Sequence, residues 1–205
     1  MTSTAVQGSQ GEPSAGATAP VGARRQILDA AADLLRHGYD ATTTRAIAAR
    51  VGIKAGSIYH HYESKEAIVS AVVNEGVRVV HEAVTSALDA LGPQASPRER
   101  VQAAIRTHLH ASLEHSAYTS ASIRAFSFLP AAVQEGCRVE RRRYEEIWRG
   151  LVAEAADAGL LAPGVSQDSV RLLLLGAVNW AGEWYRPERM SIDEIARDFA
   201  ASILR

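Results

Sequence analysis

The feature that most constrains this fold is a break in a helical pattern at Gly52-Ile53. Before the break, apolar residues recur at helical spacing, at Ile47, Ala48 and Val51. After the break, residues 55–62 form a second short helical pattern. Two short helices joined by so tight a turn predict a helix-turn-helix unit within residues 42–65, which the rest of the chain has to hold in place.

The second predicted helix of this unit is polar and aromatic where a core helix would be aliphatic. The side chains in and next to it that can form hydrogen bonds are those of Lys54, Ser57, Tyr59, His60, His61 and Tyr62. In a helix-turn-helix this helix enters the major groove of DNA, where such side chains meet phosphates and base edges. Residues 24–65 also carry seven lysines and arginines against four acidic residues, whereas residues 66–205 carry fifteen against eighteen. A basic unit on a mildly acidic body is typical of a nucleic-acid-binding module.

Composition narrows the class of protein further. The single cysteine, Cys137, excludes an internal disulfide framework and suits a reducing compartment. No uncharged apolar stretch approaches the ~20 residues that cross a bilayer, and the chain before Arg24 lacks the basic and apolar regions of a secretory signal. We therefore expect a soluble cytoplasmic protein. Residues 1–22 are mostly small or polar with one charge, so we expect a disordered tail, either inert or able to touch the DNA minor groove.

The rest of the chain indicates helices with clear boundaries and no convincing strand. We expect an all-α fold of about nine helices, with a helix-turn-helix domain over residues 23–68 and a second domain over residues 69–205. Apolar periodicity and Gly, Pro and Ser boundary signals predict further helices over 24–37, 65–91, 97–115, 118–128, 130–158 (or two helices joined near Gly136), 166–185 and 192–204. The helix over 65–91 would be ~40 Å long, enough to connect two domains, and Gly76 is a weak point in it.

Four short motifs in the first part of the chain occur together: TTTRAIA at 42–48, VGI at 51–53, GSIYHHY at 56–62 and SKE at 64–66. In combination they resemble the DNA-binding domain of the tetracycline-repressor (TetR) family, over roughly residues 24–73. The resemblance implies a homodimeric repressor of transcription that binds a double-stranded DNA operator. It also implies a C-terminal helical domain for effector binding and dimerisation.

The resemblance further implies which residues contact DNA: Thr43, Arg45, Lys54, Ser57, Tyr59, His60, His61 and Lys65. Thr43 and Arg45 would open the bracing helix, and Tyr59, His61 and Lys65 would reach phosphates. Ala55 and Gly56 also face the groove but lack hydrogen-bonding side chains. Direct base readout would therefore fall chiefly to Lys54 and His60, with a modest or shape-driven sequence preference.

Residues 172–182 (LLLLGAVNWAG) carry no charge, which indicates a helix buried on more than one face. We expect one face to pack inward and another to meet a second subunit. The helix over 192–204 has one apolar stripe and a charged outer face. Together, segments 168–185 and 191–204 predict a homodimer through a four-helix bundle, as in TetR-family dimers. The alternative is that both are ordinary core helices of a monomer.

The motif WxxxWYRP at 180–187 is similar to the C-terminal signature of TetR-family repressors that respond to acyl-CoA thioesters or steroid-degradation intermediates. We expect a pocket among the middle helices for a small apolar or CoA-thioester-like effector. Its candidate lining residues are His108, Ser112, Phe126, Phe128, Trp148, Asn179 and Trp180. Asn179 either orients the ligand or pairs across the dimer, and plain core packing is the default for the aromatic rings.

Other patterns admit a chemical interpretation. Arg141, Arg142 and Arg143 form either a site for a CoA phosphate or carboxylate or a solvated face interlaced with glutamates. The candidate metal ligands are His108, His110, Glu114 and His115. We expect no metal site, because His108 and His115 share a helix face but His110 does not join them. Catalytic and phosphate-binding motifs are absent from the sequence, so we expect neither enzyme activity nor a cofactor. The alternative function is effector-independent, architectural DNA binding, which would favour a strongly basic body.

Overall fold

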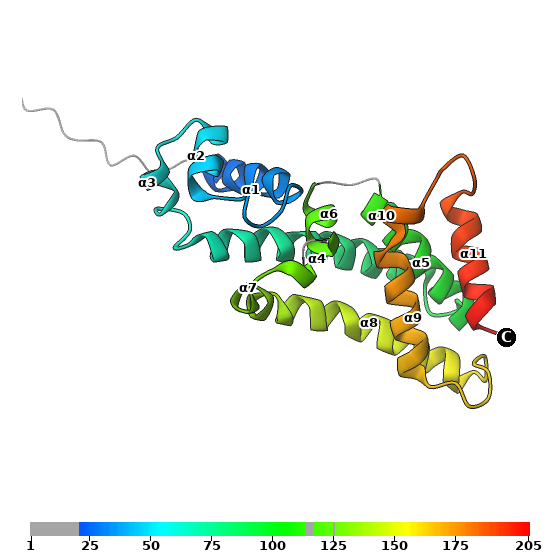
Figure 1. The fold of residues 1–205 in the computed structure, drawn as a ribbon. Coiled ribbons are helices and arrows are strands. Elements are labelled where there is room, and N and C mark those ends of the chain that lie inside the picture. Colours follow the sequence, from blue (N-terminus) through cyan, green and yellow to red (C-terminus); the bar gives the residue numbers. More distant parts are fainter. Residues whose placement is uncertain (1–20, 114–116, 125) are drawn as a thin grey trace, which may run out of the picture.

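The computed structural model describes residues 21–113, 117–124 and 126–205, and the regular structure in these ranges is helical throughout (Figure 1). The helices are α1 (Val21–Leu35), α2 (Thr44–Val51), α3 (Ala55–Ile58), α4 (Lys65–Leu91), α5 (Pro97–Leu113), α6 (Ala117–Arg124), the 3₁₀ helix η1 (Phe126–Phe128), α7 (Ala131–Gly136), α8 (Arg138–Asp157), α9 (Gln167–Asn179), α10 (Ala181–Trp184) and α11 (Ile192–Ile203). The all-α prediction is therefore confirmed. Most of the predicted tail, residues 1–20, lies outside the described residues.

The first three helices form the predicted helix-turn-helix unit. Thr43 caps α2, its side-chain oxygen accepting a hydrogen bond from the Ala46 N–H at 3.0 Å. Gly52 ends α2 in the left-handed region at φ 77°, where a glycine lacks the steric cost of a side chain, and its N–H returns to the Ala48 carbonyl. Ile47 and Ile58, one from each helix, are fully buried against α1. The tight turn predicted from the sequence thus holds α3 at a fixed angle to α2.

Helix α4 spans 27 residues and joins the two halves of the molecule. Ser64 caps its N-terminus, with the Ser64 Oγ accepting a hydrogen bond from the Ala67 N–H at 3.1 Å. Its first half contributes Val69, Val72 and Val73 to a hydrophobic cluster with α1, α2, α3, α6 and α7. Its second half contributes Val80 and Val84 to the core of the body, which includes α5, α8, α9 and α11. In Figure 1, α2 and α3 lie at one end of the molecule and α11 at the other.

Two predicted helices are each divided in two, which makes eleven α-helices in the described part of the chain instead of nine. The predicted helix over 130–158 breaks at Cys137, whose buried side chain joins the N-terminal cluster; the sequence allowed for this break near Gly136. The predicted helix over 166–185 breaks at Trp180. There the chain turns so that Ala181 is fully buried in the body while the Trp180 ring stays 62% exposed.

Two further predicted helices are shorter than expected. The helix predicted over 55–62 ends at Ile58, because the next turns tighten: the N–H groups of Tyr59, His60 and His61 each bond to the carbonyl three residues back. The segment predicted as one helix over 118–128 consists of α6 and then η1. By contrast, α4 continues unbroken through Gly76, where the sequence indicated a weak point. Within the described residues, no helix combines the length and apolar character required to cross a membrane.

Candidate nucleic-acid interface and effector cavity

The outer surface of α2 and α3 carries the residues that were predicted to contact DNA. Lys54, Tyr59 and His60 are exposed around α3, and Ser57 is half-buried between them. The Tyr59 ring is 59% exposed although it is large and mostly apolar. Because Ala55 and Gly56 are exposed on the same short helix, the backbone of α3 can approach another molecule closely.

Two of the three cations on this surface have no ion-pair partner among the described residues. Arg50 of α2 forms an ion pair with Asp33 of α1 at 2.9 Å, which fixes α2 against α1. Arg45 and Lys54 are exposed and form no ion pair with any described residue. The Thr43 oxygen caps α2, but its hydroxyl hydrogen remains able to donate. The start of α2 therefore presents a hydroxyl, a guanidinium and a helix N-terminus, which together suit a phosphate.

Residues at the start of α4 are positioned by contacts that the sequence did not reveal. The Lys65 Nζ lies 3.5 Å from the centre of the Tyr39 ring, and the Tyr39 hydroxyl donates to Glu66 Oε1 at 2.8 Å. Burial, and then the Glu66 carboxylate, raise the pKa of Tyr39 to about 12, so this hydroxyl remains a donor at neutral pH. The loop before α2 is thereby bound to α4, and the Lys65 side chain has a defined position.

His61 and Tyr62 are placed by an arginine of α1. Arg24 donates from a terminal nitrogen to the His61 carbonyl oxygen at 3.2 Å, and its guanidinium carbon lies 4.4 Å from the centre of the Tyr62 ring. Tyr62 is buried and His61 is half-buried. No local pattern in the sequence indicated that Arg24 or Tyr39 would support the DNA-binding unit, because both contacts join distant segments.

A cavity of about 50 Å³ lies among α4, α5, α6, α8 and α9. It is lined by Gly76, Val77, Val80, His108, Ser122, Ile123, Arg141, Tyr144, Glu145, Leu175 and Asn179. Most of its surface is apolar, although six of the eleven lining residues carry a polar or charged group. That combination is typical of a small-molecule site.

His108 is the most deeply buried polar group at this cavity, with 1% of its surface exposed. Its Nδ1 lies 2.6 Å from the Tyr144 hydroxyl, while its Nε2 has no hydrogen-bond partner among the described residues. Burial lowers the pKa of His108 to about 3, so the ring is neutral at physiological pH. Burial also raises the pKa of Tyr144. The cavity thus contains a neutral hydrogen-bonding pair with one unused ring nitrogen.

The other predicted pocket residues are distributed unevenly around this cavity. Asn179 lines it, as His108 does. Trp148 is fully buried behind the His108 and Tyr144 rings, and Ser112 is half-buried with its hydroxyl unpaired in the described structure. Phe126 packs on Arg141 instead of facing the cavity. Two aromatic side chains point to the surface of the protomer: Phe128, which is 86% exposed, and Trp180.

The sequence did not identify Gly76 or the aliphatic residues that line the cavity. Aliphatic residues at helical spacing look the same in a sequence whether they line a cavity or fill a packed core. Glu114 and His115 of the rejected metal pattern lie outside the described residues. Within the residues that the structure describes, no three His, Cys, Asp or Glu side chains are grouped as metal ligands would be.

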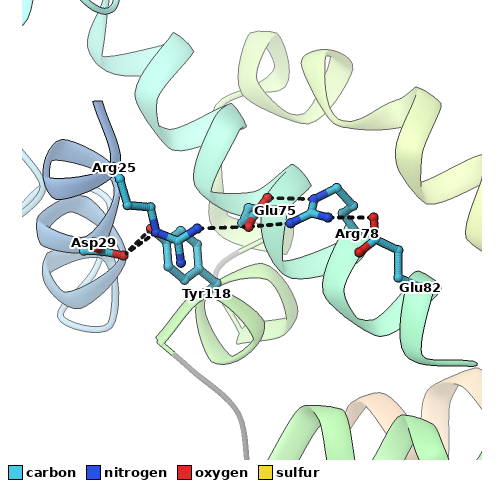
Figure 2. A network of polar contacts seen from close by, with 6 residues as sticks. All are labelled: Arg25, Asp29, Glu75, Arg78, Glu82 and Tyr118. Atoms are coloured by element: carbon cyan, nitrogen blue, oxygen red, sulfur yellow. Dashed lines mark hydrogen bonds and ion pairs between the residues drawn. The ribbon is translucent and has the colours of Figure 1, made fainter. Parts of the chain in front are cut away.

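A polar network connects the DNA-binding unit to the rest of the molecule (Figure 2). It comprises Arg25 and Asp29 of α1, Tyr118 of α6, and Glu75, Arg78 and Glu82 of α4. The Tyr118 hydroxyl donates to Asp29 Oδ1 at 2.6 Å, and Arg25 reaches both Asp29 at 3.1 Å and Glu75 at 3.3 Å. Burial, and then the hydrogen bond to Asp29, raise the pKa of Tyr118.

The contact between α6 and α4 in this region is very close. A Cβ atom on Gly76 would lie 2.5 Å from the Tyr118 carbonyl oxygen and 2.8 Å from the Ser122 hydroxyl. Gly76 and Ser122 both line the cavity, and Tyr118 belongs to the polar network. The short helix α6 is therefore one wall of the cavity and, one turn away, an attachment point of α1.

Both halves of the chain match models of one protein family. Residues 27–72 match the model described as bacterial regulatory proteins of the tetR family, and residues 94–205 match the tetracyclin repressor-like C-terminal domain. The chain belongs to the TetR family. As a TetR-family protein it is a helix-turn-helix regulator of transcription, as its motifs and its DNA-facing surface indicated.

Individual TetR-family relatives extend over nearly the whole chain. The transcriptional repressor KstR2 of Rhodococcus jostii (strain RHA1) is 27% identical over 89% of this chain and 90% of its own length. Among solved structures, AibR in complex with isovaleryl coenzyme A and operator DNA is 25% identical, covers 88% of this chain and 97% of its own, and has a TM-score of 0.75. PfiT, described as a superantigen, is 31% identical with a TM-score of 0.75 over 92% of this chain and 99% of its own.

Proposed function

We propose that this protein is a homodimeric repressor that binds a palindromic operator and releases it when a small apolar or CoA-thioester-like effector enters the cavity. The observation that carries the proposal is the double role of α6. This helix lines the cavity through Ser122 and Ile123 and is bonded to α1 of the DNA-binding unit through Tyr118. A ligand that moves α6 therefore acts on the helix against which α2 and α3 pack.

At the operator, α3 enters the major groove, with Lys54 and His60 as the principal base-reading side chains. Tyr59, His61 and Lys65 contact phosphates, as do Thr43 and Arg45 at the start of α2. Support comes from the two exposed cations, Arg45 and Lys54, which have no counter-ion among the described residues. Ser57 is half-buried, which restricts it to a close contact at the groove floor or to the backbone.

The dimer interface centres on the outer face of α9. Leu172, Leu173 and Trp180 are 61%, 63% and 62% exposed, and Gly176 lies exposed between them. These positions recur at helical spacing, so they form one continuous apolar stripe that a monomer would leave in water. A Cβ on Gly176 would meet nothing within 4 Å in the protomer, so a second helix can approach closely there.

Segment 191–204, the second half of the predicted interface, contributes at the rim. The outer face of α11 is charged, with Asp193, Glu194, Arg197 and Asp198 all exposed. Its apolar stripe is turned into the body, and Phe199 packs against the Trp184 ring with ring centres 5.9 Å apart. Trp184 is itself 37% exposed, which extends the apolar face of α9 towards α11.

Effector binding requires the cavity to expand. Pockets for drug-sized ligands measure about 300–1,000 Å³, whereas this cavity measures about 50 Å³. We infer that the described form is closed and that α6, attached to α4 at Gly76, is the wall that yields. An effector shifts the equilibrium only by its greater affinity for the open form, so the form with α6 displaced has to bind DNA less tightly.

The proposed effector class is supported by the cavity and by one relative whose structure contains a ligand. Its aliphatic walls suit an acyl chain or another apolar body. AibR was solved with isovaleryl coenzyme A, and KstR2 is a repressor of similar length. We propose an effector of that kind, acting in the cytoplasm where the operator DNA is found.

The proposal is tested by selecting genomic DNA fragments with the purified full-length protein and then measuring binding to the enriched site by fluorescence anisotropy. We expect a palindromic site bound by a dimer, with half-sites about 34–36 Å apart centre to centre, and release by an acyl-CoA or a similar apolar ligand. Equal affinity for unrelated DNA with a steep salt dependence would instead indicate architectural binding. An operator complex that survives saturation with every ligand found to bind would refute induced release.

A further inference from the structure

One cation at the effector cavity is placed differently from its neighbours on α8. Arg141 is half-buried and lines the cavity, whereas Arg142 and Arg143 are exposed. Burial lowers the pKa of the Arg141 guanidinium, although not enough to remove its charge, because arginine stays protonated in proteins. The three arginines therefore do not form one site. Arg142 and Arg143 belong to the solvated face, and Arg141 belongs to the cavity.

Unlike three of its neighbours on α8, Arg141 forms no direct ion pair with a described residue. Arg138, Arg143 and Arg149 each pair with a glutamate three residues before them. Position 138, three residues before Arg141, is itself an arginine. The glutamate four residues after it, Glu145, also lines the cavity, and its charge raises the pKa of Arg141, but its ion pair is with Arg171 of α9 at 3.7 Å. Among the described residues, Arg141 forms neither an ion pair nor a side-chain hydrogen bond.

An aromatic ring holds the Arg141 side chain in place. Its guanidinium carbon lies 3.9 Å from the centre of the Phe126 ring in η1. Stacking on one face leaves the N–H groups at the edge of the guanidinium plane available, and these are the groups that bind a carboxylate or phosphate in bidentate fashion. Arg141 therefore has a fixed orientation and unused donors beside the aliphatic walls formed by Val77, Ile123 and Leu175.

From this arrangement we propose that Arg141 binds an anionic oxygen group of the effector, a carboxylate or a phosphate, at the polar end of the cavity. The inference rests on the proposed effector function and specifies the ligand as an apolar body with an anionic group. A half-buried guanidinium with no direct ion pair or hydrogen bond is costly, and an anion that entered the cavity would bind it through charge-assisted hydrogen bonds. The unpartnered Nε2 of His108, which is 1% exposed, offers a second polar contact to the same ligand.

The two sources of the anion are distinguishable with matched probes. Straight-chain acids from butyrate to decanoate supply a carboxylate, the corresponding acyl-CoA thioesters supply phosphates, and the corresponding alcohols have the same chains without charge. Binding to the full-length protein is measured by isothermal titration calorimetry. The test variant is Arg141→Gln, and Arg142→Gln is the matched control because it removes an exposed arginine from the next position of the same helix.

We expect wild type to bind an anionic probe more tightly than the alcohol of equal chain length. Arg141→Gln should weaken that binding by about 10- to 100-fold, which is the usual range for a lost charge-assisted bond, and leave alcohol binding unchanged. Arg142→Gln should behave as wild type. A loss confined to the acids identifies a carboxylate, and a loss confined to the thioesters identifies a phosphate. The melting temperature of unliganded Arg141→Gln should equal or exceed that of wild type, which separates a lost contact from a lost fold.

Three outcomes would overturn the inference: anionic probes bind Arg141→Gln as tightly as wild type, the alcohols bind wild type as tightly as the anions, or none of the anionic probes binds wild type. Operator binding measured on the same samples separates this failure from that of the proposed function. A protein that binds its operator but ignores the anions retains its proposed role as a repressor and loses only the Arg141 site.

Discussion

Replacing Gly76 with alanine tests whether the close contact of α6 with α4 controls DNA binding. The added Cβ would lie 2.5 Å from the Tyr118 carbonyl oxygen and 2.9 Å from the Ser122 Cβ. Side-chain rotation relieves neither contact, since one involves a backbone atom and the other a Cβ. Because real Cβ contacts under 3.0 Å are essentially never seen, α6 has to withdraw by at least about half an ångström.

The expected stability change is the sum of two opposing effects. Alanine favours the helical backbone by about 1 kcal/mol over glycine, and overpacking costs about 1–3 kcal/mol. Gly150→Ala is the matched control, because Gly150 lies inside α8 and a Cβ there meets nothing within 4 Å. The control should gain about 1 kcal/mol, so the two variants should differ by about 1–3 kcal/mol in free energy of unfolding. For a chain of this size the difference corresponds to roughly 2–12 °C in melting temperature.

The functional expectation follows from the hydrogen bond between Tyr118 and Asp29. Displacement of α6 stretches that bond and alters the position of α1, so Gly76→Ala should bind the operator more weakly than wild type without any effector. Gly150→Ala should bind normally. Melting curves at a fixed protein concentration and anisotropy titrations with the selected operator provide both measurements. If Gly76→Ala melts at or above the temperature of Gly150→Ala and binds the operator as tightly, the proposed path from cavity to DNA is refuted.

Three further predictions follow from the described contacts. Leu173→Arg places a charge in the apolar stripe of α9, so size-exclusion chromatography should show monomers and operator affinity should fall steeply; an intact dimer would disprove the proposed interface. Lys54→Ala should cost about 1–3 kcal/mol of operator binding and relax specificity at one base position, whereas Lys65→Ala should weaken all sequences alike and lower the salt dependence; similar effects from both would argue against their separate roles. Burial lowers the pKa of His108 to about 3, so below about pH 6.5 this histidine takes up a proton in the unfolded chain but not in the folded protein. Its contribution to the free energy of unfolding is therefore complete above about pH 6.5 and falls by up to ~1.4 kcal/mol per pH unit below that pH. The free energy of unfolding, measured with urea between pH 5 and 7, should depend less on pH in His108→Leu than in wild type. An equal dependence on pH in both proteins would contradict this origin.

Local sequence signals predicted several helix ends correctly. Ser191, the serine boundary signal before the helix predicted over 192–204, forms a capping box with Glu194, with both reciprocal hydrogen bonds present. Helices α2 and α4 also end at Gly52 and Gly92, where their ends were predicted. These signals succeed because a cap depends on residues within one turn of each other.

Features that depend on distant segments were not predictable in the same way. No residue near position 180 indicates the break at Trp180, after which Ala181 is buried in the body. Gly76 reads as a weak helical position, and only the fold shows that α6 lies against it. The same limitation affected the cavity. Asn179 was found because it is polar in an apolar helix, whereas Trp180 has the same aromatic character as a lining residue and faces outward.

The position of α4 in both hydrophobic clusters limits how the molecule can be divided. A cut after residue 68 would separate α1, α2 and α3 from Val69, Val72 and Val73, which fill the middle of their core, and from side chains of α6 and α7 that close it. Helices α1, α2 and α3 therefore cannot be moved alone into another protein with their hydrophobic core intact. A chimeric regulator that combines this DNA specificity with a different effector domain has to keep the first half of α4 with α6 and α7, and so inherits part of the effector cavity along with the DNA-reading helices.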